Sequence, residues 1–292
     1  MSKYFAPSEL IINSDGSCFH LHLKPEQLAD KVILVGDPGR VDIIAAMFDS
    51  IECTVESREF RTATGLYHGK RITVQSTGIG CDNIDIVMNE LDTLANIDYQ
   101  TRTEKPGHRT LDIVRIGTCG GLQPYTPIGT YLCSIKSIGF DGLLNFYDGR
   151  DRVCDLEFEQ AFCHHMDWSP KKAAPYVACA DPTLLERIMA DDPAMVPGVT
   201  IACPGFYGPQ GRVLRAGLQD PEQNSKVESF EYKGMRITNF EMESSAVAGM
   251  ASLLGHRAMT VCMVIANRYA KEMNTDYKPL MTALIQKVLE RI

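Results

Sequence analysis

Glycines and an arginine end the first apolar run of the chain, in the segment GDPGR at residues 36–40. The run before it, residues 31–36, has the composition of a buried strand, and a helical pattern follows. At such a junction glycines let backbone N–H groups approach an anion, the helix N-terminus adds positive potential, and an arginine can bind two oxygens. A Pro-Gly turn with a solvated arginine explains the same residues. Alone, the segment leaves an anion site and a plain turn equally open.

Two more glycine-rich segments follow strand-like runs: STGIG at residues 76–80 and RIGTCGG at residues 115–121. Arg115 lies inside an apolar strand, where an unpaired guanidinium is very costly to bury, so we expect it to have an anionic partner. Three such strand ends, two with an arginine, suit an oxyanion site at the carboxyl edge of an α/β sheet. None matches the GxGxxG or P-loop pattern, which argues against a dinucleotide or nucleoside triphosphate site.

Two later segments carry groups that suit a heterocycle and a sugar. FYGPQGR at residues 206–212 combines an aromatic ring, an amide and a guanidinium, which can stack on a base and hydrogen-bond its polar edge. An exposed loop with an incidental aromatic residue is the alternative. NFEMES at residues 239–244 places two carboxylates just before a helix, where they can accept hydrogen bonds from vicinal hydroxyls. Glu243 can instead serve helix-start electrostatics alone.

Alternating strands and helices must position these segments. The strand-like runs are near-continuously apolar, as in strands buried on both faces, and they cover residues 31–36, 72–77, 111–117, 130–135, 176–180, 235–240 and 259–265. Helical periodicity covers residues 41–48, 84–95, 182–189, 244–254 and 280–289. This order predicts an α/β protein with a mixed or mainly parallel sheet, in one domain over residues 1–292. Residues 96–109 and 145–168 are predicted as surface insertions on that domain.

The composition restricts the class of protein. The chain has 292 residues and a net charge of -8, which argues against a broad nucleic-acid surface or a polybasic membrane contact. It has no apolar run of membrane-spanning length, and its N-terminus lacks the pattern of a signal peptide, so we expect a cytoplasmic protein. The ten cysteines are scattered without a CxxC pair, which predicts reduced, mostly buried thiols and no metal site.

In this order the five segments resemble the nucleoside phosphorylases of the uridine phosphorylase type, a family that includes hexameric purine nucleoside phosphorylases. Three shorter motifs extend the resemblance over nearly the whole chain: FHL at residues 19–21, SREF at 57–60 and VIANR at 264–268. The resemblance implies a single-domain, three-layer α/β/α nucleoside phosphorylase fold with a central mixed sheet. It also implies a pentosyltransferase that reversibly cleaves uridine with phosphate to uracil and ribose 1-phosphate, in pyrimidine salvage and nucleoside catabolism. Deoxyuridine and thymidine remain open as further substrates.

The resemblance also assigns roles to individual residues. Phosphate binding is carried over to Gly36, Arg40, Arg115 and Thr118, with Arg58 supplied by a neighbouring subunit. Ribose binding is carried over to Met242 and Glu243, with His20 supplied by the neighbour. Base binding is carried over to Gly120, Phe206, Gln210, Arg212, Ile265, Ala266 and Arg268. The groups expected to act on the reacting atoms are Arg115, Glu243, Gln210 and Arg212.

Sites shared in this way imply a homo-oligomer, either a dimer or a hexamer built as a trimer of dimers. Phosphate is a co-substrate, and the resemblance implies no organic cofactor. Some bacterial relatives hold a monovalent cation between subunits at positions that match Glu59, Ile79 and Asn83. Serine is usual at the last of these positions.

Other functions differ from this one in what they demand of the residues. Purine-cleaving relatives place an aspartate, which protonates the leaving purine, where this chain has Asn267, so the amide favours pyrimidines. A hydrolytic nucleosidase would use water and leave the phosphate-directed arginines without a purpose. A sensor of nucleoside or phosphate would not need Glu243 and Gln210 for simple retention. A purine nucleoside phosphorylase and a hydrolytic nucleosidase remain the alternatives.

Overall fold

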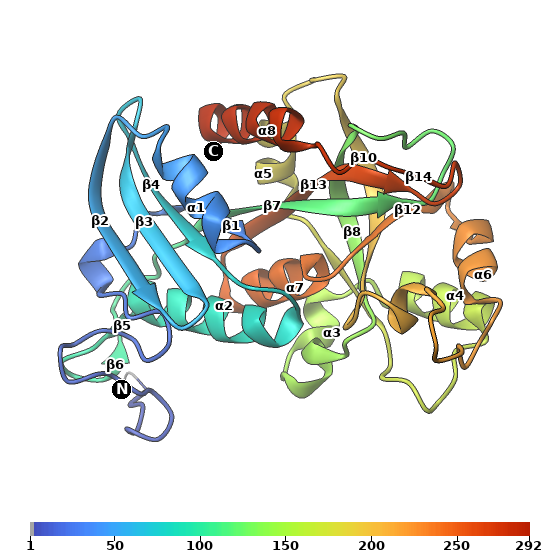
Figure 1. The fold of residues 1–292 in the computed structure, drawn as a ribbon. Coiled ribbons are helices and arrows are strands. Elements are labelled where there is room, and N and C mark those ends of the chain that lie inside the picture. Colours follow the sequence, from blue (N-terminus) through green and yellow to red (C-terminus); the bar gives the residue numbers. More distant parts are fainter. Residues whose placement is uncertain (1–2) are drawn as a thin grey trace.

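A mixed sheet of twelve strands forms the centre of the computed structural model, which describes residues 3–292 (Figure 1). Its strands are β1 Lys31–Val35, β2 Ser50–Ser57, β3 Phe60–Tyr67, β4 Lys70–Ser76, β7 Asp112–Gly121, β8 Tyr131–Gly139, β9 Tyr176–Cys179, β10 Met195–Ala202, β11 Glu231–Tyr232, β12 Met235–Glu241, β13 Arg257–Asn267 and β14 Glu272–Met273. A separate small sheet pairs β5 Ile97–Asp98 with β6 Thr103–Glu104.

Eight α-helices are described in residues 3–292: α1 Pro38–Ala45, α2 Cys81–Asn96, α3 Arg150–Val153, α4 Leu156–Met166, α5 Pro182–Met189, α6 Gln223–Ser229, α7 Ser244–Leu254 and α8 Lys278–Arg291. Three short 3-10 helices are η1 Pro25–Gln27, η2 Leu143–Phe146 and η3 Gly208–Gln210. Within the same residues, every helix is too short or too polar to cross a lipid bilayer.

Strand β7 lies at the centre of the pairing. It is parallel to β1 on one side and to β13 on the other. From β13 the sheet continues through β8 and β10 to β12, and the end of β12 turns back to pair with the end of β7, where Asn239 lies opposite Gly121. The five strands β7, β13, β8, β10 and β12 therefore form a closed circle, which we call the five-strand closure.

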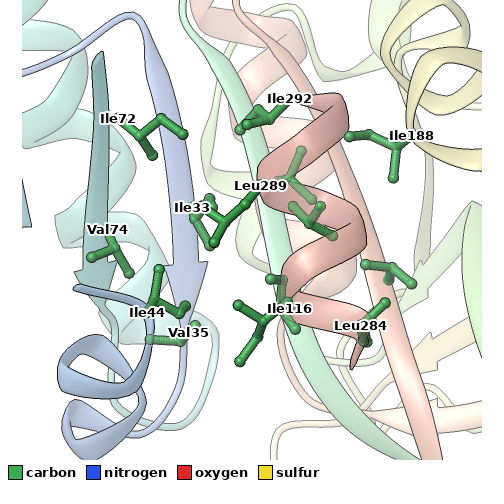
Figure 2. Packing of buried hydrophobic residues seen from close by; sticks show 14 of the residues in the cluster. Ile33, Val35, Ile44, Ile72, Val74, Ile116, Ile188, Leu284, Leu289 and Ile292 are labelled. Atoms are coloured by element: carbon green, nitrogen blue, oxygen red, sulfur yellow. The ribbon is translucent and has the colours of Figure 1, made fainter. Parts of the chain in front are cut away.

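Two hydrophobic clusters, one on each face of the sheet, separate three layers. Ile33 and Val35 of β1 belong to the cluster formed with α1, α5 and α8, in which Leu289 packs near the strands (Figure 2). Val32 and Leu34 belong to the opposite cluster, which contains α2 and α7. Alternate side chains of one strand are thus buried on both faces, which explains the continuous apolar runs. The predicted three-layer α/β/α fold with a mixed sheet is confirmed.

The apolar pattern does not predict β2, β3 or β10. β2 is the outer strand of its side of the sheet, and most of its side chains are exposed or half-buried. β3 alternates threonine with small residues, so its buried side chains form no apolar run. β10 contains Pro197 and Gly198, which argue against a central strand, and its register with β8 shifts directly after Gly198. Helix α1 ends at Ala45, earlier than the predicted residue 48.

The two predicted surface segments differ in burial. Residues 96–109 contain the β5–β6 pair and follow α2. Residues 145–168 contain α3 and α4, and Phe158 and Phe162 of α4 are fully buried in a third cluster with side chains of β10 and β12. A surface location is therefore wrong for this face of α4, because its aromatic side chains complete the core.

Candidate active site

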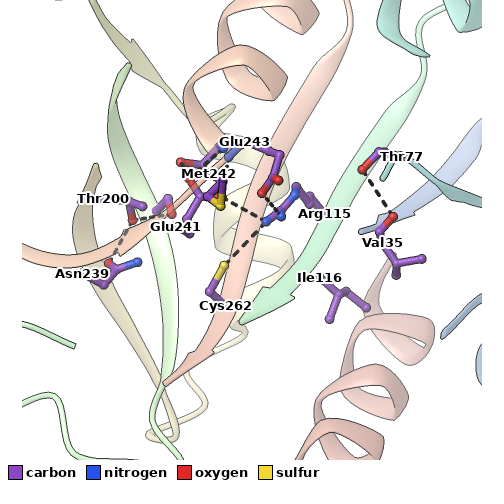
Figure 3. A network of polar contacts seen from close by, with 12 residues as sticks. Val35, Thr77, Arg115, Ile116, Thr200, Asn239, Glu241, Met242, Glu243 and Cys262 are labelled. Carbon is purple, nitrogen blue, oxygen red and sulfur yellow. Dashed lines mark hydrogen bonds and ion pairs between the residues drawn. The ribbon is translucent and has the colours of Figure 1, made fainter. Parts of the chain in front are cut away.

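The ends of β1 and β4 touch at one edge of the sheet. The N–H of Thr77, just after β4, donates to the carbonyl of Val35 at the end of β1, 2.8 Å away. The Thr77 hydroxyl contacts the same carbonyl at 3.4 Å (Figure 3). A Cβ on Gly36 would lie 3.3 Å from the carbonyl oxygen of Gly78, so glycine permits this approach. β7, which pairs with β1, passes the same edge. The structure brings the three glycine-rich segments together, as the sequence predicts.

Arg115 on β7 is the centre of a buried ion cluster (Figure 3). Its side chain is 5% exposed, pairs with Glu243, and lies 3.1 Å from a carboxylate oxygen of Glu241. Its Nη1 also contacts the Sγ of Cys262 on β13, 3.7 Å away. Burial lowers the pKa of Arg115, but the two carboxylates more than offset this and leave the pKa above its ordinary value. The predicted anionic partner is confirmed.

Glu241 has a structural task that the sequence does not reveal. Its carboxylate accepts the backbone N–H groups of Glu243 and Ser244, each at 2.9 Å, and the Ser244 hydroxyl at 2.7 Å. These groups lie at the start of α7, so Glu241 satisfies unpaired donors of the helix and neutralises Arg115 at the same time. The only sequence signal for it is the pair of carboxylates in the segment 239–244.

Glu243 connects β7 with the loop that follows β4. One carboxylate oxygen contacts Arg115, and the other accepts the N–H of Gly80 at 2.7 Å. Burial, opposed by Arg115 and aided by Glu241, raises the pKa of Glu243 to about 7. Met242, the other ribose residue predicted in this segment, is half-buried next to it. Burial therefore makes the carboxyl expected to meet the sugar easier to protonate than an exposed glutamate.

Arg40 in the first turn of α1 is buried without an acidic partner in the part of the chain that the structure describes. The hydrogen bond that its guanidinium makes there is to the carbonyl of Ile116, 3.2 Å away. Burial and the nearby Arg115 lower the pKa of Arg40. Thr118 follows on β7 and is half-buried. Among the phosphate residues predicted within one chain, Arg40 is thus the buried cation that no carboxylate in residues 3–292 contacts.

The base loop, residues 203–212, follows β10. Its Gln210 is 3% exposed, whereas Phe206 is 48% exposed. The Arg212 guanidinium lies 3.7 Å from the centre of the Phe206 ring and donates to the Phe206 carbonyl at 2.5 Å and to Gln210 Oε1 at 2.6 Å. The aromatic, amide and guanidinium side chains predicted for the base therefore contact one another.

Arg268 reaches the base loop from the end of β13. Its backbone N–H donates to the carbonyl of Gly121, and its guanidinium donates to the carbonyl of Gln210. Burial and the neighbouring Arg212 lower the pKa of Arg268 to about 10. A Cβ on Gly120 would lie 3.9 Å from the Arg268 Nε, so this glycine borders the same group. The remaining predicted base residues, both half-buried on β13, are Ile265 and Ala266.

Asn267 is buried and engaged by backbone groups. Its amide nitrogen donates to the carbonyls of Gln123 and Thr126, at 3.2 and 2.7 Å, and its oxygen accepts the N–H of Ala270 at 2.8 Å. These contacts tie the loop after β7 to the loop after β13. The Asn267 amide therefore holds two loops together, and it cannot act as the acid that protonates a leaving purine.

His20 and Arg58 both contact the ring of Phe19. The Phe19 ring makes an edge contact with His20, at 4.7 Å between ring centres, and the Arg58 guanidinium lies 5.5 Å from the Phe19 ring centre. His20 Nδ1 contacts a Glu90 carboxylate oxygen at 2.6 Å. Within residues 3–292 neither side chain makes a hydrogen bond or ion pair with the phosphate residues. We call this group the His20 surface cluster.

The three positions that match a cation site in some relatives surround Gly78. A Cβ on Gly78 would lie 2.5 Å from the Asn83 amide nitrogen and 3.6 Å from the Glu59 Cγ. Ile79 follows directly and is 73% exposed. These residues are close in space, and their use as ligands stays a prediction.

Comparisons with known proteins show the family and the fold. Residues 30–292 match the family model of the phosphorylase superfamily. A uridine phosphorylase of Thermococcus kodakarensis is 30% identical over 274 residues, which are 93% of this chain and 85% of the relative. A uridine phosphorylase of Escherichia coli is 32% identical over 271 residues, 89% of each chain.

A solved structure gives the same result for the fold. The crystal structure of a Trypanosoma brucei nucleoside phosphorylase, described as showing uridine phosphorylase activity, is 31% identical to this chain. It superposes with a TM-score of 0.85 and covers 97% of this chain and 98% of its own. By the family model, the curated relatives and the shared fold, this chain belongs to the phosphorylase superfamily.

Proposed function

We propose that this protein catalyses the reversible, phosphate-dependent cleavage of uridine to uracil and ribose 1-phosphate. The observation that carries the proposal is Arg40, a buried guanidinium beside Arg115 with no acidic partner in residues 3–292. A bound phosphate would supply the missing charge. The base loop supports uracil as the leaving group, because Gln210 and Arg212 together offer both donors and an acceptor. The uridine phosphorylases among the relatives support the same reaction.

The reaction needs partners for two developing charges. Cleavage of an N-glycosidic bond places positive charge on the sugar and negative charge on the departing base. Phosphate held by Arg40 and Arg115 attacks the anomeric carbon, so a C–O bond forms as the C–N bond breaks. Gln210 and Arg212 stabilise the charge on the uracil carbonyls. Because side chains and phosphate meet both charges, the chemistry needs no cofactor, and phosphate is the co-substrate.

Turnover of uridine is expected to require inorganic phosphate or arsenate. Arg40→Ala removes a charge-assisted contact worth about 1.5–3 kcal/mol, so the rate at limiting phosphate falls about ten- to a hundredfold. Release of uracil is measured with and without phosphate. Arg236→Ala, which removes an exposed arginine paired with Glu231, is the matched control and retains full activity. Equal rates in phosphate-free buffer would identify a hydrolytic nucleosidase.

We also infer a homo-oligomer, a dimer or a trimer of dimers, in which neighbouring subunits share active sites. The His20 surface cluster supports this arrangement, because Arg58 is exposed and, within residues 3–292, neither His20 nor Arg58 makes a hydrogen bond or ion pair with the phosphate residues of its own chain. The phosphate site would then be complete only in the assembled protein, because a neighbouring subunit supplies one of its arginines.

A mixture of two inactive variants is expected to regain activity. Arg58→Ala lacks the residue given to the neighbour, and Glu243→Ala lacks a residue of its own site, so a mixed pair contains one site without either lesion. After random reassociation about a quarter of all sites in a dimer are intact. Uridine phosphorolysis is measured before and after joint dissociation and reassembly. Each variant reassembled with itself is the control, and mixed oligomers that stay inactive would disprove the shared site.

We place the reaction in the cytoplasm, in pyrimidine salvage and nucleoside catabolism. The ten cysteines, all within the described residues, are unpaired in the structure, which is typical of a reducing compartment. The net charge of -8 agrees with small anionic and neutral substrates held in a local site rather than with a nucleic-acid partner.

A further inference from the structure

Two amide side chains at the start of α6 hold the backbone of the base loop. Nε2 of Gln223 donates to the carbonyl of Pro209 at 2.9 Å, and Nδ2 of Asn224 donates to the carbonyl of Gly211 at 3.3 Å. These two carbonyls flank Gln210. The amides therefore fix the position of Gln210 through its neighbours, from an element that carries none of the predicted base residues.

Lys172 determines how Gln223 is oriented. Its Nζ donates to Gln223 Oε1 at 3.0 Å and lies 4.7 Å from the centre of the Trp168 ring. A lysine has donors only, so Gln223 must present its oxygen to Lys172 and its NH₂ group to Pro209. Gln223 is 6% exposed, so its amide is largely withdrawn from solvent. Two hydrogen bonds of Gln223 thus connect Lys172, in the segment after α4, to the base loop.

Packing does not fix the base loop on this side. A cavity of about 420 Å³ separates Trp168 and its surroundings from Gly208 and Pro209 of the loop. No side chain within residues 3–292 fills this space, so η3 has room to move into it. Hydrogen bonds rather than packing therefore restrain η3: the two amide contacts, the Arg268 contact to the Gln210 carbonyl and a contact of the Cys203 thiol to the Pro209 carbonyl at 3.5 Å. At Gly211, which has φ +70°, a Cβ would overlap the Asn224 amide, so glycine lets that amide approach.

We propose that Gln223, oriented by Lys172, is a positioning residue for uracil recognition by Gln210. The inference rests on the proposed function and adds a determinant of base selectivity that lies outside the base site. With the contact to Pro209 in place, the Gln210 amide is held for the polar edge of uracil. Without it η3 shifts toward the cavity, and a misplacement of about 1 Å lowers the efficiency of a reacting group by about a hundredfold at most. Phosphate binding, on α1 and β7, is independent of this contact.

The test compares Gln223→Leu with Gln223→Glu in the full-length protein. Leucine removes both hydrogen bonds at similar volume, whereas glutamate keeps the contact to Lys172 and loses only the donor to Pro209. Both are expected to raise KM for uridine about tenfold and to lower the preference for uridine over cytidine by a similar factor. KM for phosphate stays unchanged, and melting temperatures identify variants that fail to fold.

Substitutions of the lysine separate its role from that of a neighbouring charge. Lys172→Met is expected to raise KM for uridine by a smaller factor, and Lys172→Arg, which keeps a donor, restores the parent value. Lys171→Met, which removes an exposed lysine one residue earlier, is the matched control and leaves all parameters unchanged.

Two results would overturn the inference. One is an unchanged KM for uridine and unchanged base preference in Gln223→Leu. The other is a lower kcat for every nucleoside at constant base preference, because a merely structural contact would reduce only the amount of active protein. Calorimetric titration with uracil gives an independent reading of the base site. Absence of phosphorolysis in the unsubstituted protein would instead refute the proposed function, and this inference with it.

Discussion

Replacing Gln210 by leucine is expected to lower the rate of uridine cleavage by about two to four orders of magnitude. Gln210 is 3% exposed, and leucine keeps its approximate volume while removing the amide that would meet the charge on the leaving base. Arg212 loses the Oε1 acceptor that it contacts at 2.6 Å. KM for phosphate is expected to stay constant, because Arg40 and Arg115 lie on other elements.

The measurement is cleavage of uridine, cytidine, inosine and adenosine by the unsubstituted protein and by Gln210→Leu. Cytidine fails because its amino group would oppose Arg212 with a donor, and adenosine fails because it leaves buried polar groups unpaired. Gln100→Leu, at an exposed glutamine between β5 and β6, is the control. Equal cleavage of inosine or adenosine and uridine, or full activity of Gln210→Leu, would overturn the base site in favour of a purine nucleoside phosphorylase.

Arg115→Met is expected to reduce both stability and turnover. The free energy of unfolding falls by about 3–5 kcal/mol, because buried Glu241 and Glu243 lose the cation between them. Glu241 keeps its hydrogen bonds at the start of α7, so Glu243 carries most of the penalty. Phosphate-dependent turnover falls by at least about two orders of magnitude, since the central guanidinium of the phosphate site is gone. Urea unfolding and uridine phosphorolysis measure the two effects.

The stability loss of Arg115→Met is expected to depend on pH. The pKa of Glu243 is already raised from 4.5 to about 7, and removing the opposing effect of Arg115 raises it further. A carboxyl with a raised pKa in the folded state binds more protons folded than unfolded, so stability is lost as pH rises from the unfolded pKa up to the folded pKa, and in Arg115→Met this loss continues to a higher pH. The deficit is therefore smaller at pH 5.5 than at pH 8.5. Adding Glu243→Gln restores part of it at pH 8.5, and a deficit that is larger at pH 5.5 would contradict this account.

The sequence predicts the strands with continuous apolar runs better than the other strands. β1 and β13 are buried on both faces and therefore leave continuous apolar runs. β2 lies at the edge of the sheet, and its apolar and polar residues alternate only weakly. In β10, Pro197 and Gly198 are residues typical of a turn. The sequence predicts helix α4 as part of a surface segment, although Phe158 is fully buried. Where burial is one-sided or irregular, periodicity loses its signal.

In the candidate active site, too, the sequence predicts some of the contacts and not others. The cost of burying Arg115 is enough to predict an acidic partner, and the structure supplies two. The task of Glu241 at the start of α7 depends on three-dimensional contacts that spacing alone does not encode. Gln223 lies in a polar stretch with no motif, and only the folded chain brings it to Pro209. The sequence shows that Asn267 replaces the acid expected of a purine-cleaving enzyme, but its contacts with backbone carbonyls appear only in the structure.

The five-strand closure has a consequence for how the protein can change over evolutionary time. Arg115 stands on a strand bound to three others, so most substitutions around it disturb the pairing of the whole sheet. The base loop takes part in no strand pairing and is held by a few side-chain contacts. A substitution in the base loop can therefore change the nucleobase that is accepted without altering the strand pairing around Arg115. One fold can in this way give rise to enzymes of different specificity, because variants of the base loop keep the folded sheet.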